Sequence, residues 1–296
     1  MEYRELGKNI AIIAGYNNTG VIENGANTVL IDSGEGDKTA GHISRLLEER
    51  GLTPSVIINA HSHADHCGGN NYLQKKYGLE IISTHKESLF IENPFLESFC
   101  FFSGSKPIKE ITDRFLLAAP SRVTRVISPG EKIKIADLEI SFLTLAGHSP
   151  EHIGVVVNDI IFCGDAFYSE HVLKRYKLPF LCDVDNSIRA LELLAGTEYE
   201  LYIPSHGIPT RDIALEVELN LEKMRKIEQD ILSILVREKT TEELMEELFA
   251  KYMINTMSVQ EFFLLRTTVL AYLSSLCSRN VVRNGFKEGI LSWKRM

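Results

Sequence analysis

The sequence predicts an α+β protein of 296 residues with two parts. Between residue 10 and about residue 204, short runs of apolar, often β-branched residues alternate with segments whose apolar residues recur at helical spacing. After about residue 210 these short runs give way to long helical patterns. We therefore expect one α+β domain over residues 1–210 and a smaller helical domain over residues 211–296.

The first elements are expected to form a meander of strands, then a helix and a buried strand. Runs at Ile10–Ala14, Gly20–Ile22 and Asn27–Ile31 are separated by glycine and asparagine residues, which favour turns. From Thr39 to Gly51 the apolar residues have helical spacing. The short run Val56–Ala60 is rich in β-branched residues and predicts a buried strand.

The loop after this strand reads His61-Ser62-His63-Ala64-Asp65-His66. It holds four good metal ligands in six residues, including three of the nine histidines in the chain. A loop at the end of a buried strand is a rigid place from which side chains can converge on an ion. His61 and His63 can bind one ion while Asp65 and His66 bind a second about 3.5–4 Å away. The alternative is a polar loop whose histidines lie together by chance, and the density of ligands favours the metal site.

Three later strand ends carry further candidate ligands. The expected strand Leu138–Leu145 leads into Ala146-Gly147-His148-Ser149, and a hairpin around Asn158-Asp159 ends at Cys163-Gly164-Asp165-Ala166. The strand Glu200–Ile203 leads into Pro204-Ser205-His206-Gly207. Together with the histidine-rich loop and with Asp32-Ser33-Gly34 after the third strand, these motifs resemble the signature of the metallo-β-lactamase superfamily of hydrolases.

The resemblance implies an αββα sandwich and a two-metal site. The ligands that it implies for the first ion are His61, His63 and His148. Those that it implies for the second ion are Asp65, His66 and His206, with Asp165 bridging both ions. Asp32 would support the ligands without binding metal itself. The family usually has proline where Ala146 stands and glycine where Ser205 stands, and these departures affect the loops more than the chemistry.

Four other potential ligands are left outside the metal site. A lone histidine is more often structural, so His85 and His152 are not assigned to metal. Cys67 and Cys163 lie close to ligands in the sequence, and thiolates can bind zinc. Neither cysteine occupies a ligand position of the motif, so we expect both to be buried and uninvolved.

Residues 86–125 separate the histidine-rich loop from the later motifs and are rich in phenylalanine. One interpretation is a pair of helices that cover the sheet. The other is an apolar wall beside the metals, because ligand pockets are mostly apolar with few polar groups. The sequence favours neither, and the second would imply a substrate with an apolar part.

The C-terminal segment is expected to hold three helices and a β-hairpin. A long helix is predicted from Asp212 to Val236, and the pairs Thr240 with Glu243 and Ser258 with Glu261 predict capping boxes for two more. Residues 281–293, with Asn284-Gly285 between two apolar runs, predict a hairpin. This order resembles the winged-helix domain of one branch of the superfamily, which includes the β-lactamase-like-2 type endoribonucleases. A dimerisation element or a lid over the site is the alternative.

The composition limits the partners and the compartment. A net charge of −8 argues against non-specific binding to nucleic acid or anionic membranes, and no apolar stretch is long enough to span a membrane. The five cysteines are scattered and unpaired in pattern, which fits a reducing cytoplasm. We therefore expect a cytoplasmic protein without a membrane partner, and a homodimer is an open alternative to a monomer.

The predicted activity is hydrolysis by a hydroxide that bridges two divalent metal ions, which lower the pKa of a shared water. Asp65 is the predicted catalytic residue, since it is placed to receive a proton. Zinc suits a site of imidazoles and carboxylates, and iron and manganese are alternatives. His63 stands where the flavodiiron proteins of the superfamily carry an acidic residue, which disfavours that redox branch.

The sequence leaves two classes of substrate open. Hydrolysis of an ester, thioester or lactone, as in the glyoxalase II-like hydroxyacylglutathione hydrolases, is favoured. The alternative is phosphodiester cleavage of RNA, supported by the resemblance to a winged helix and by basic residues near the C-terminus. Against RNA, residues 211–296 hold thirteen basic and thirteen acidic residues, which gives no strong positive surface.

Overall fold

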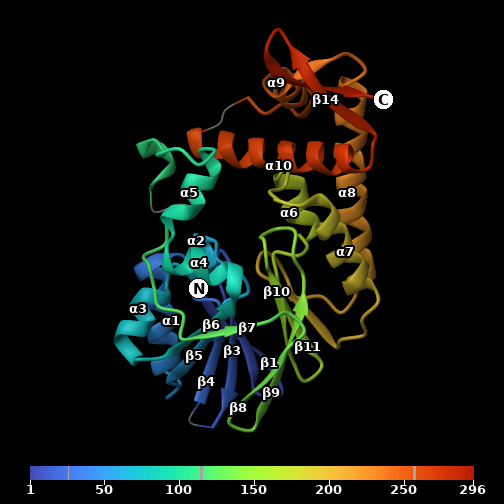
Figure 1. Cartoon of the computed structure of the whole chain (residues 1–296). Helices are drawn as coiled ribbons and strands as arrows, with labels where there is room; N and C mark the ends of the chain where they lie inside the picture. Colours follow the sequence, from blue (N-terminus) through green and yellow to red (C-terminus); the bar gives the residue numbers. More distant parts are fainter. Residues whose placement is uncertain (26, 114–115, 256–257) are drawn as a thin grey trace.

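Two β-sheets stacked face to face, with helices on their outer sides, form the lower part of the molecule in Figure 1. The structure is a computed structural model that describes residues 1–25, 27–113, 116–255 and 258–296. The four layers confirm the predicted α+β class and its αββα arrangement.

The first sheet has seven strands in sequence order. Strands β1 to β4 pair antiparallel, and β4 to β7 pair parallel. Two of its strands, β1 and β7, were missed in the sequence because they lie at the two edges and are short or polar. Its strands are β1 (Glu2–Gly7), β2 (Ile10–Ala14), β3 (Thr19–Asn24), β4 (Asn27–Ile31), β5 (Pro54–Ile58), β6 (Glu80–Thr84) and β7 (Arg125–Ile127).

The second sheet has the order β12-β11-β10-β9-β8. Strands β8 to β11 are antiparallel neighbours, and β12 joins β11 in parallel after a helical crossover. Its strands are β8 (Lys132–Ile135), β9 (Leu138–Thr144), β10 (Ile153–Val157), β11 (Ile160–Gly164) and β12 (Leu201–Pro204).

Alternating side chains on the strands build the core. On β2, Ile10 and Ile12 pack between the two sheets, whereas Ala11 and Ile13 pack under the outer helices. This is the period of two that a strand imposes on its side chains. The outer helices are α1 (Gly36–Glu48) and α3 (Asn70–Tyr77) on the first sheet and α7 (Val184–Ala195) on the second. The short helix α6 (Glu170–Arg175) precedes α7 and lies above the sheets in Figure 1.

The segment after β6 forms the covering helices that one interpretation of residues 86–125 predicts. They are α4 (His85–Glu92), α5 (Phe95–Phe101) and the short 3-10 helix η1 (Lys109–Ile111). Residues 114 and 115 of this segment lie outside the described residues. We call residues 86–125 the cap. In it, a small buried cluster of Phe101, Ile111 and Leu116 packs against side chains of the C-terminal segment.

The C-terminal segment crosses over the cap. In Figure 1, α10 lies above α5 and α6, and α9 with the last strands lies beyond α10. A continuous buried cluster runs from α7 and β11 into α8, α9 and α10. Both the domain boundary at residue 210 and the winged-helix assignment stay predictions. The elements are α8 (Ile213–Ile234), β13 (Lys239–Thr240), α9 (Thr241–Tyr252), α10 (Val259–Ser278), β14 (Val282–Lys287) and β15 (Ile290–Arg295).

The turn of the C-terminal hairpin differs from the prediction. Lys287 pairs with Ile290, so the turn is Glu288-Gly289, both with positive φ, and Asn284-Gly285 lie inside β14. This register lets β13 pair with β15 at Ser292 and Trp293 and buries the Trp293 ring. Tertiary pairing therefore outweighs the local turn preference of Asn-Gly.

Of the two predicted capping boxes, the one at α9 has both of its hydrogen bonds and the one at α10 has one of them. Thr240 accepts from the Glu243 N–H and Glu243 accepts from the Thr240 N–H, which completes the first capping box. Ser258 accepts from the Glu261 N–H, and among the described residues around it the return bond is not formed.

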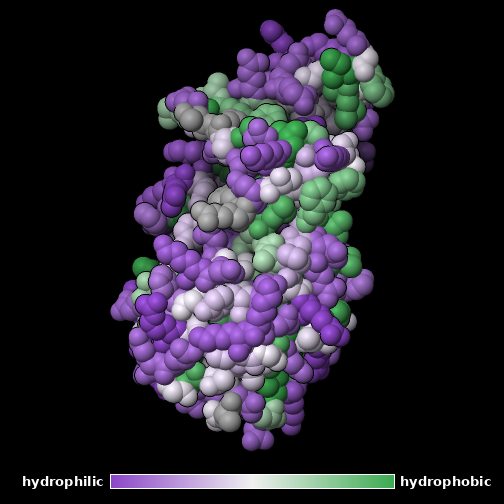
Figure 2. Space-filling model, turned by 90° about the vertical axis from the view of Figure 1, so that its left-hand side faces the viewer, coloured by the Kyte–Doolittle hydropathy of each residue, from purple (hydrophilic) through white to green (hydrophobic). Residues whose placement is uncertain are grey.

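The hydropathy of the helices and of the surface tests the expectation that the chain does not span a membrane. In the part of the chain that the structure describes, no helix combines the length and hydropathy needed to cross a bilayer. On the face drawn in Figure 2, hydrophilic residues dominate the lower half, and hydrophobic residues are more frequent in the upper half. Cytoplasmic location and homodimer formation stay predictions.

Candidate metal centre

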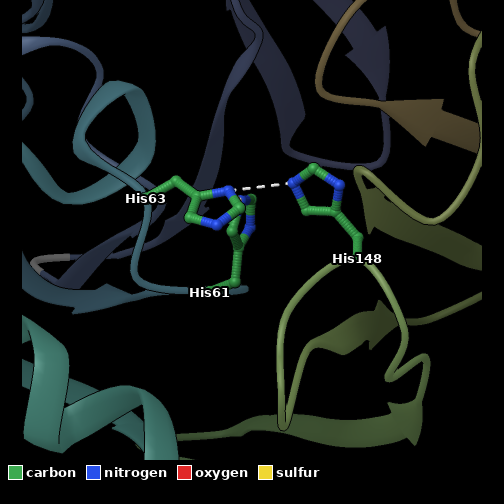
Figure 3. A group of neighbouring side chains, drawn as sticks. All are labelled: His61, His63 and His148. Carbon is green, nitrogen blue, oxygen red and sulfur yellow. Dashed lines mark hydrogen bonds between the residues drawn. The ribbon is translucent and has the colours of Figure 1, made fainter. Parts of the chain in front are cut away.

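The side chains of His61, His63 and His148 converge although they come from different sheets (Figure 3). His61 and His63 lie in the loop after β5, and His148 lies in the loop after β9. The Nδ1 atom of His63 lies 3.0 Å from His61 Nε2 and 2.9 Å from His148 Nε2. Two ligands of one tetrahedral zinc ion lie about 3.3 Å apart when each is about 2.0–2.1 Å from the metal. The three nitrogen atoms therefore have nearly the spacing of one ion's ligands.

Two carboxylates and two imidazoles form a second group beside the first. His206 Nε2 lies 3.2 Å from Asp65 Oδ2, and His66 Nε2 lies 3.6 Å from the same oxygen. Asp165 lies between the groups, with one oxygen 3.6 Å from His66 Nε2 and the other 3.4 Å from His148 Nε2. All seven predicted ligands thus come together, and Asp165 lies where a bridging carboxylate would have to be. Their role as ligands stays a prediction.

The hydrogen bonds around the rings leave one nitrogen of each facing inward. His66 Nδ1 lies 2.8 Å from Asp32 Oδ2, and His148 Nδ1 lies 3.2 Å from the Phe180 carbonyl. His206 Nδ1 lies 3.1 Å from the Tyr16 carbonyl. Since a carbonyl only accepts, Nδ1 of His148 and of His206 carries the proton, and Nε2 presents its lone pair to the centre. This tautomer is the one that binds metal.

Unpartnered buried atoms give an independent test of whether these residues fit a metal. Among the described residues, His66 Nε2 and Asp165 Oδ1 are buried without a hydrogen-bond partner. Buried polar atoms are normally hydrogen-bonded, and each exception calls for an explanation. A cation between these atoms would satisfy both, so the donor set around them fits a divalent ion.

The pKa shifts of the histidines differ between the two ligand groups. Burial lowers the pKa of His61 and His148 well below the usual histidine value, so both rings are neutral. Burial alone would also lower the pKa of His66, but Asp65, Asp165 and Asp32 outweigh it and raise that pKa well above the usual value. Burial opposes ionisation of Asp65, yet His66 and His206 bring its pKa down to about 2. The carboxylates of the second group therefore stabilise positive charge at this place, which is what a bound cation needs.

Asp32 supports His66 in the way that the resemblance implies. It is buried, it follows β4, and its other oxygen accepts from the Ala60 N–H at 2.9 Å. Its φ of 62° is a left-handed conformation that aspartate and asparagine tolerate better than most residues. The carboxylate thus fixes both the ring of His66 and the start of the ligand loop.

The unassigned candidates lie outside the three ligand groups found among the described residues. His85 is exposed. His152 is buried, with Nδ1 2.9 Å from the Leu145 carbonyl and Nε2 accepting from the Asp165 N–H, so it has a structural role. Burial raises the pKa of both Cys67 and Cys163, which keeps their thiols neutral. That none of the four binds metal stays a prediction.

A cavity of about 450 Å³ opens onto the ligands. Its walls include Leu116 of the cap and Leu264 of α10, so residues 86–125 both cover the sheet and line the site. Sequence reasoning missed Glu97 and Tyr168. Burial, with the charges of Asp65 and Glu87, raises the pKa of Glu97 to about 8, and burial raises the pKa of Tyr168 well above its usual value. No local sequence signal distinguishes these two residues from their neighbours.

Comparison with known proteins decides the family. A sequence model of the metallo-beta-lactamase superfamily matches residues 12–206. The chain belongs to this superfamily. The predicted superfamily and the coarse prediction of a metal-dependent hydrolase are therefore confirmed, whereas the number and identity of the metals stay predictions.

Several relatives and solved structures are similar to the chain. A hydroxyacylglutathione hydrolase of Thiobacillus denitrificans is 25% identical over 128 residues, which cover 43% of this chain and only 38% of that protein. A probable metallo-hydrolase of Methanocaldococcus jannaschii is 26% identical over 65% of this chain and 89% of its own length. A metallo-beta-lactamase family protein of Thermus thermophilus superposes with a TM-score of 0.75 at 19% identity, covering 99% of this chain and 96% of its own. This last likeness is one of fold, and it extends through the C-terminal segment.

Proposed function

We propose that this protein is a two-metal hydrolase that cleaves an ester or thioester bond in a small molecule with an apolar part. The observation that carries the proposal is the position of the ligand groups, which face a cavity closed by apolar side chains of the cap and of α10. Similarity to a hydroxyacylglutathione hydrolase, a name that denotes cleavage of an acyl thioester, supports the same class.

The residues have separate tasks in this proposal. A pair of divalent ions supplies the lowered pKa of a shared water and an electrophilic contact for the substrate carbonyl. Asp65 stays ionised and is 28% exposed, so it can accept a proton at the cavity wall. The Tyr168 hydroxyl stays neutral and lies 3.1 Å from His148 Nδ1, where it can orient that ring or donate to a substrate oxygen.

The charges of the site favour a small substrate over RNA. Among the described residues that line the cavity, Arg175 is the single lysine or arginine, and Glu35 is an acidic residue outside the ligand set. Glu97 adds little charge at neutral pH, because its pKa is raised to about 8. In the C-terminal segment, Lys287 binds Glu243 and Arg279 binds Glu228, so part of its positive charge is already neutralised. A polyanion would gain little from such a surface.

The test combines metal analysis with two activity screens on the same purified protein. We expect about two metal ions per chain and turnover of acyl-glutathione thioesters, aryl esters or lactones. His63→Ala and Asp165→Ala should each abolish turnover while the circular dichroism spectrum stays that of the wild type. His171→Ala, which removes an exposed histidine of α6, is the matched control and should keep full activity.

Two results would contradict the proposal in different ways. Salt-sensitive cleavage of single-stranded RNA without ester or thioester turnover would favour the nuclease alternative. Full activity in both the His63 and the Asp165 variants would mean that the ligand assignment is wrong.

A further inference from the structure

Glu87 of α4 is a fully buried carboxylate that belongs to none of the ligand groups. Its Oε2 atom accepts two hydrogen bonds from Ser62, at 3.0 Å from the backbone N–H and 2.6 Å from the hydroxyl. Its Oε1 atom accepts from the Ser149 hydroxyl at 2.8 Å and from the Glu151 N–H at 2.8 Å. Both oxygens are therefore used, and the four donors come from two different loops.

These two loops hold the three histidines of the first ligand group. Ser62 lies between His61 and His63, and Ser149 directly follows His148. The first loop extends from the first sheet and the second from the second sheet. Between the sheets the contacts are largely apolar, and hydrophobic packing is non-directional. The bonds of Glu87 are directional, so they can fix how the two loops face one another.

The four donors from the two ligand loops explain why an acceptor with two oxygens stands at this place. A buried charge is costly unless it is fully hydrogen-bonded. Among the described residues no lysine or arginine forms an ion pair with Glu87, so the backbone and hydroxyl donors alone stabilise it. Apolar side chains at this place would leave the four donors without an acceptor and would not hold the ligand backbone at defined distances.

We propose that Glu87 is a positioning residue, which locks the His61–His63 loop to the His148 loop and so presets the spacing of the first metal group. The inference rests on the proposed metal centre. Glu87 itself touches neither metal nor substrate in this proposal; it acts through Ser62 and Ser149. Residues that orient metal ligands in this way commonly change metal affinity by about 10–100-fold when they are replaced.

The experiment compares Glu87→Gln with Glu92→Gln. Glu92 is on the same helix and also holds a loop through its carboxylate, accepting from the Val123 N–H at 3.0 Å. Among the described residues, it forms no hydrogen bond or ion pair with a ligand loop. The glutamine of E87Q keeps one acceptor oxygen and turns an amide NH₂ toward two donors. We expect the dissociation constant for zinc, measured by chelator competition, to rise about 10–100-fold in E87Q. In E92Q it should stay at the wild-type value.

A spectroscopic measurement separates positioning from general stability. The visible absorption of the cobalt(II)-loaded protein reports the geometry of the metal site, and we expect it to change in E87Q and not in E92Q. If both variants lower the melting temperature while zinc affinity and cobalt spectrum stay those of the wild type, Glu87 is only structural and the inference is wrong.

A milder variant keeps the test decisive if E87Q does not fold. Ser149→Ala removes one hydroxyl donor and leaves the backbone bonds of Glu87 in place. It should weaken zinc binding by about 3–10-fold, and unchanged binding would overturn the inference. Wild-type protein that binds no zinc would refute the metal centre itself, which is a different result from equal binding by wild type and variants.

Discussion

Replacing Asp32 with asparagine isolates the contribution of its charge. Asparagine has the same shape and tolerates the left-handed backbone at this position, so neither packing nor φ should change. The oxygen that accepts from Ala60 can be kept. The bond to His66 cannot be kept in its present form, because an amide NH₂ can only donate to Nδ1. Without metal, the neighbouring carboxylates favour the charged ring of His66, which has a proton on both nitrogens. Metal binding needs the neutral ring with its proton on Nδ1 and Nε2 free toward Asp65 and Asp165, and the amide of D32N disfavours that form.

The size of the effect follows from the buried charge-assisted bond. The bond is 2.8 Å long, and both side chains are almost fully buried. Hydrogen bonds to charged groups contribute about 1.5–3 kcal/mol. At about 1.4 kcal/mol for each tenfold change, this corresponds to roughly 10–150-fold weaker binding of the second metal ion. The loss should appear in metal affinity first, because the tautomer that the variant favours must change before metal can bind.

Zinc titration against a competing chelator measures this directly, with Asp37→Asn as the control. Asp37 is an exposed aspartate in the first turn of α1, and its variant should bind both ions like the wild type. Thermal unfolding of the metal-free proteins checks that the fold is intact. If D32N binds two zinc ions with affinities within about threefold of the wild type, a difference under 1 kcal/mol, then Asp32 does not set the tautomer of His66 and the reasoning is refuted.

Two further predictions test other parts of the molecule. Burial alone would raise the pKa of Asp230, but hydrogen bonds from Lys251, Tyr252 and Lys226 outweigh it and lower that pKa. Asp230→Asn should therefore reduce the free energy of unfolding by about 1–2 kcal/mol at pH 7. The difference from wild type should shrink below about pH 4 as Asp230 becomes protonated. Urea titrations at several pH values measure this, and a difference that does not depend on pH would contradict it. Leu264→Ala removes an apolar wall of the cavity and should raise KM for substrates with apolar acyl groups about fivefold, for about 1 kcal/mol of lost burial. Metal content should stay unchanged, and an unaltered KM across acyl chains would place the substrate elsewhere.

The convergence of the candidate ligands could be predicted from sequence because each of them lies at the end of a strand within a short motif. His61, His63 and His66 follow β5 within a few residues, so their proximity is fixed by the chain itself. His148 and His206 are far away in sequence, and their strands bring them back because the carboxyl ends of β9 and β12 reach the same edge of the sandwich. Here the resemblance to a family supplied what spacing alone could not.

Where local signals competed, the sequence prediction was less reliable. Asn284-Gly285 is a strong turn signal, yet the hairpin turns at Glu288-Gly289 because that register pairs β15 with β13 and buries Trp293. The edge strands β1 and β7 carry charged residues and show no clear alternation of apolar and polar residues. The sequence pattern therefore does not predict them, and they form by pairing with neighbouring strands.

The sequence by itself determined the sandwich and the superfamily, and it predicted which residues are the candidate ligands. Only the tertiary structure decided what surrounds that chemistry. Leu264 of α10 and Glu97 of α5 reach the cavity, and Glu87 of α4 joins two ligand loops, through contacts between segments that are distant in the chain. Such contacts depend on how helices pack over the sheets, and packing leaves no short-range pattern in the sequence.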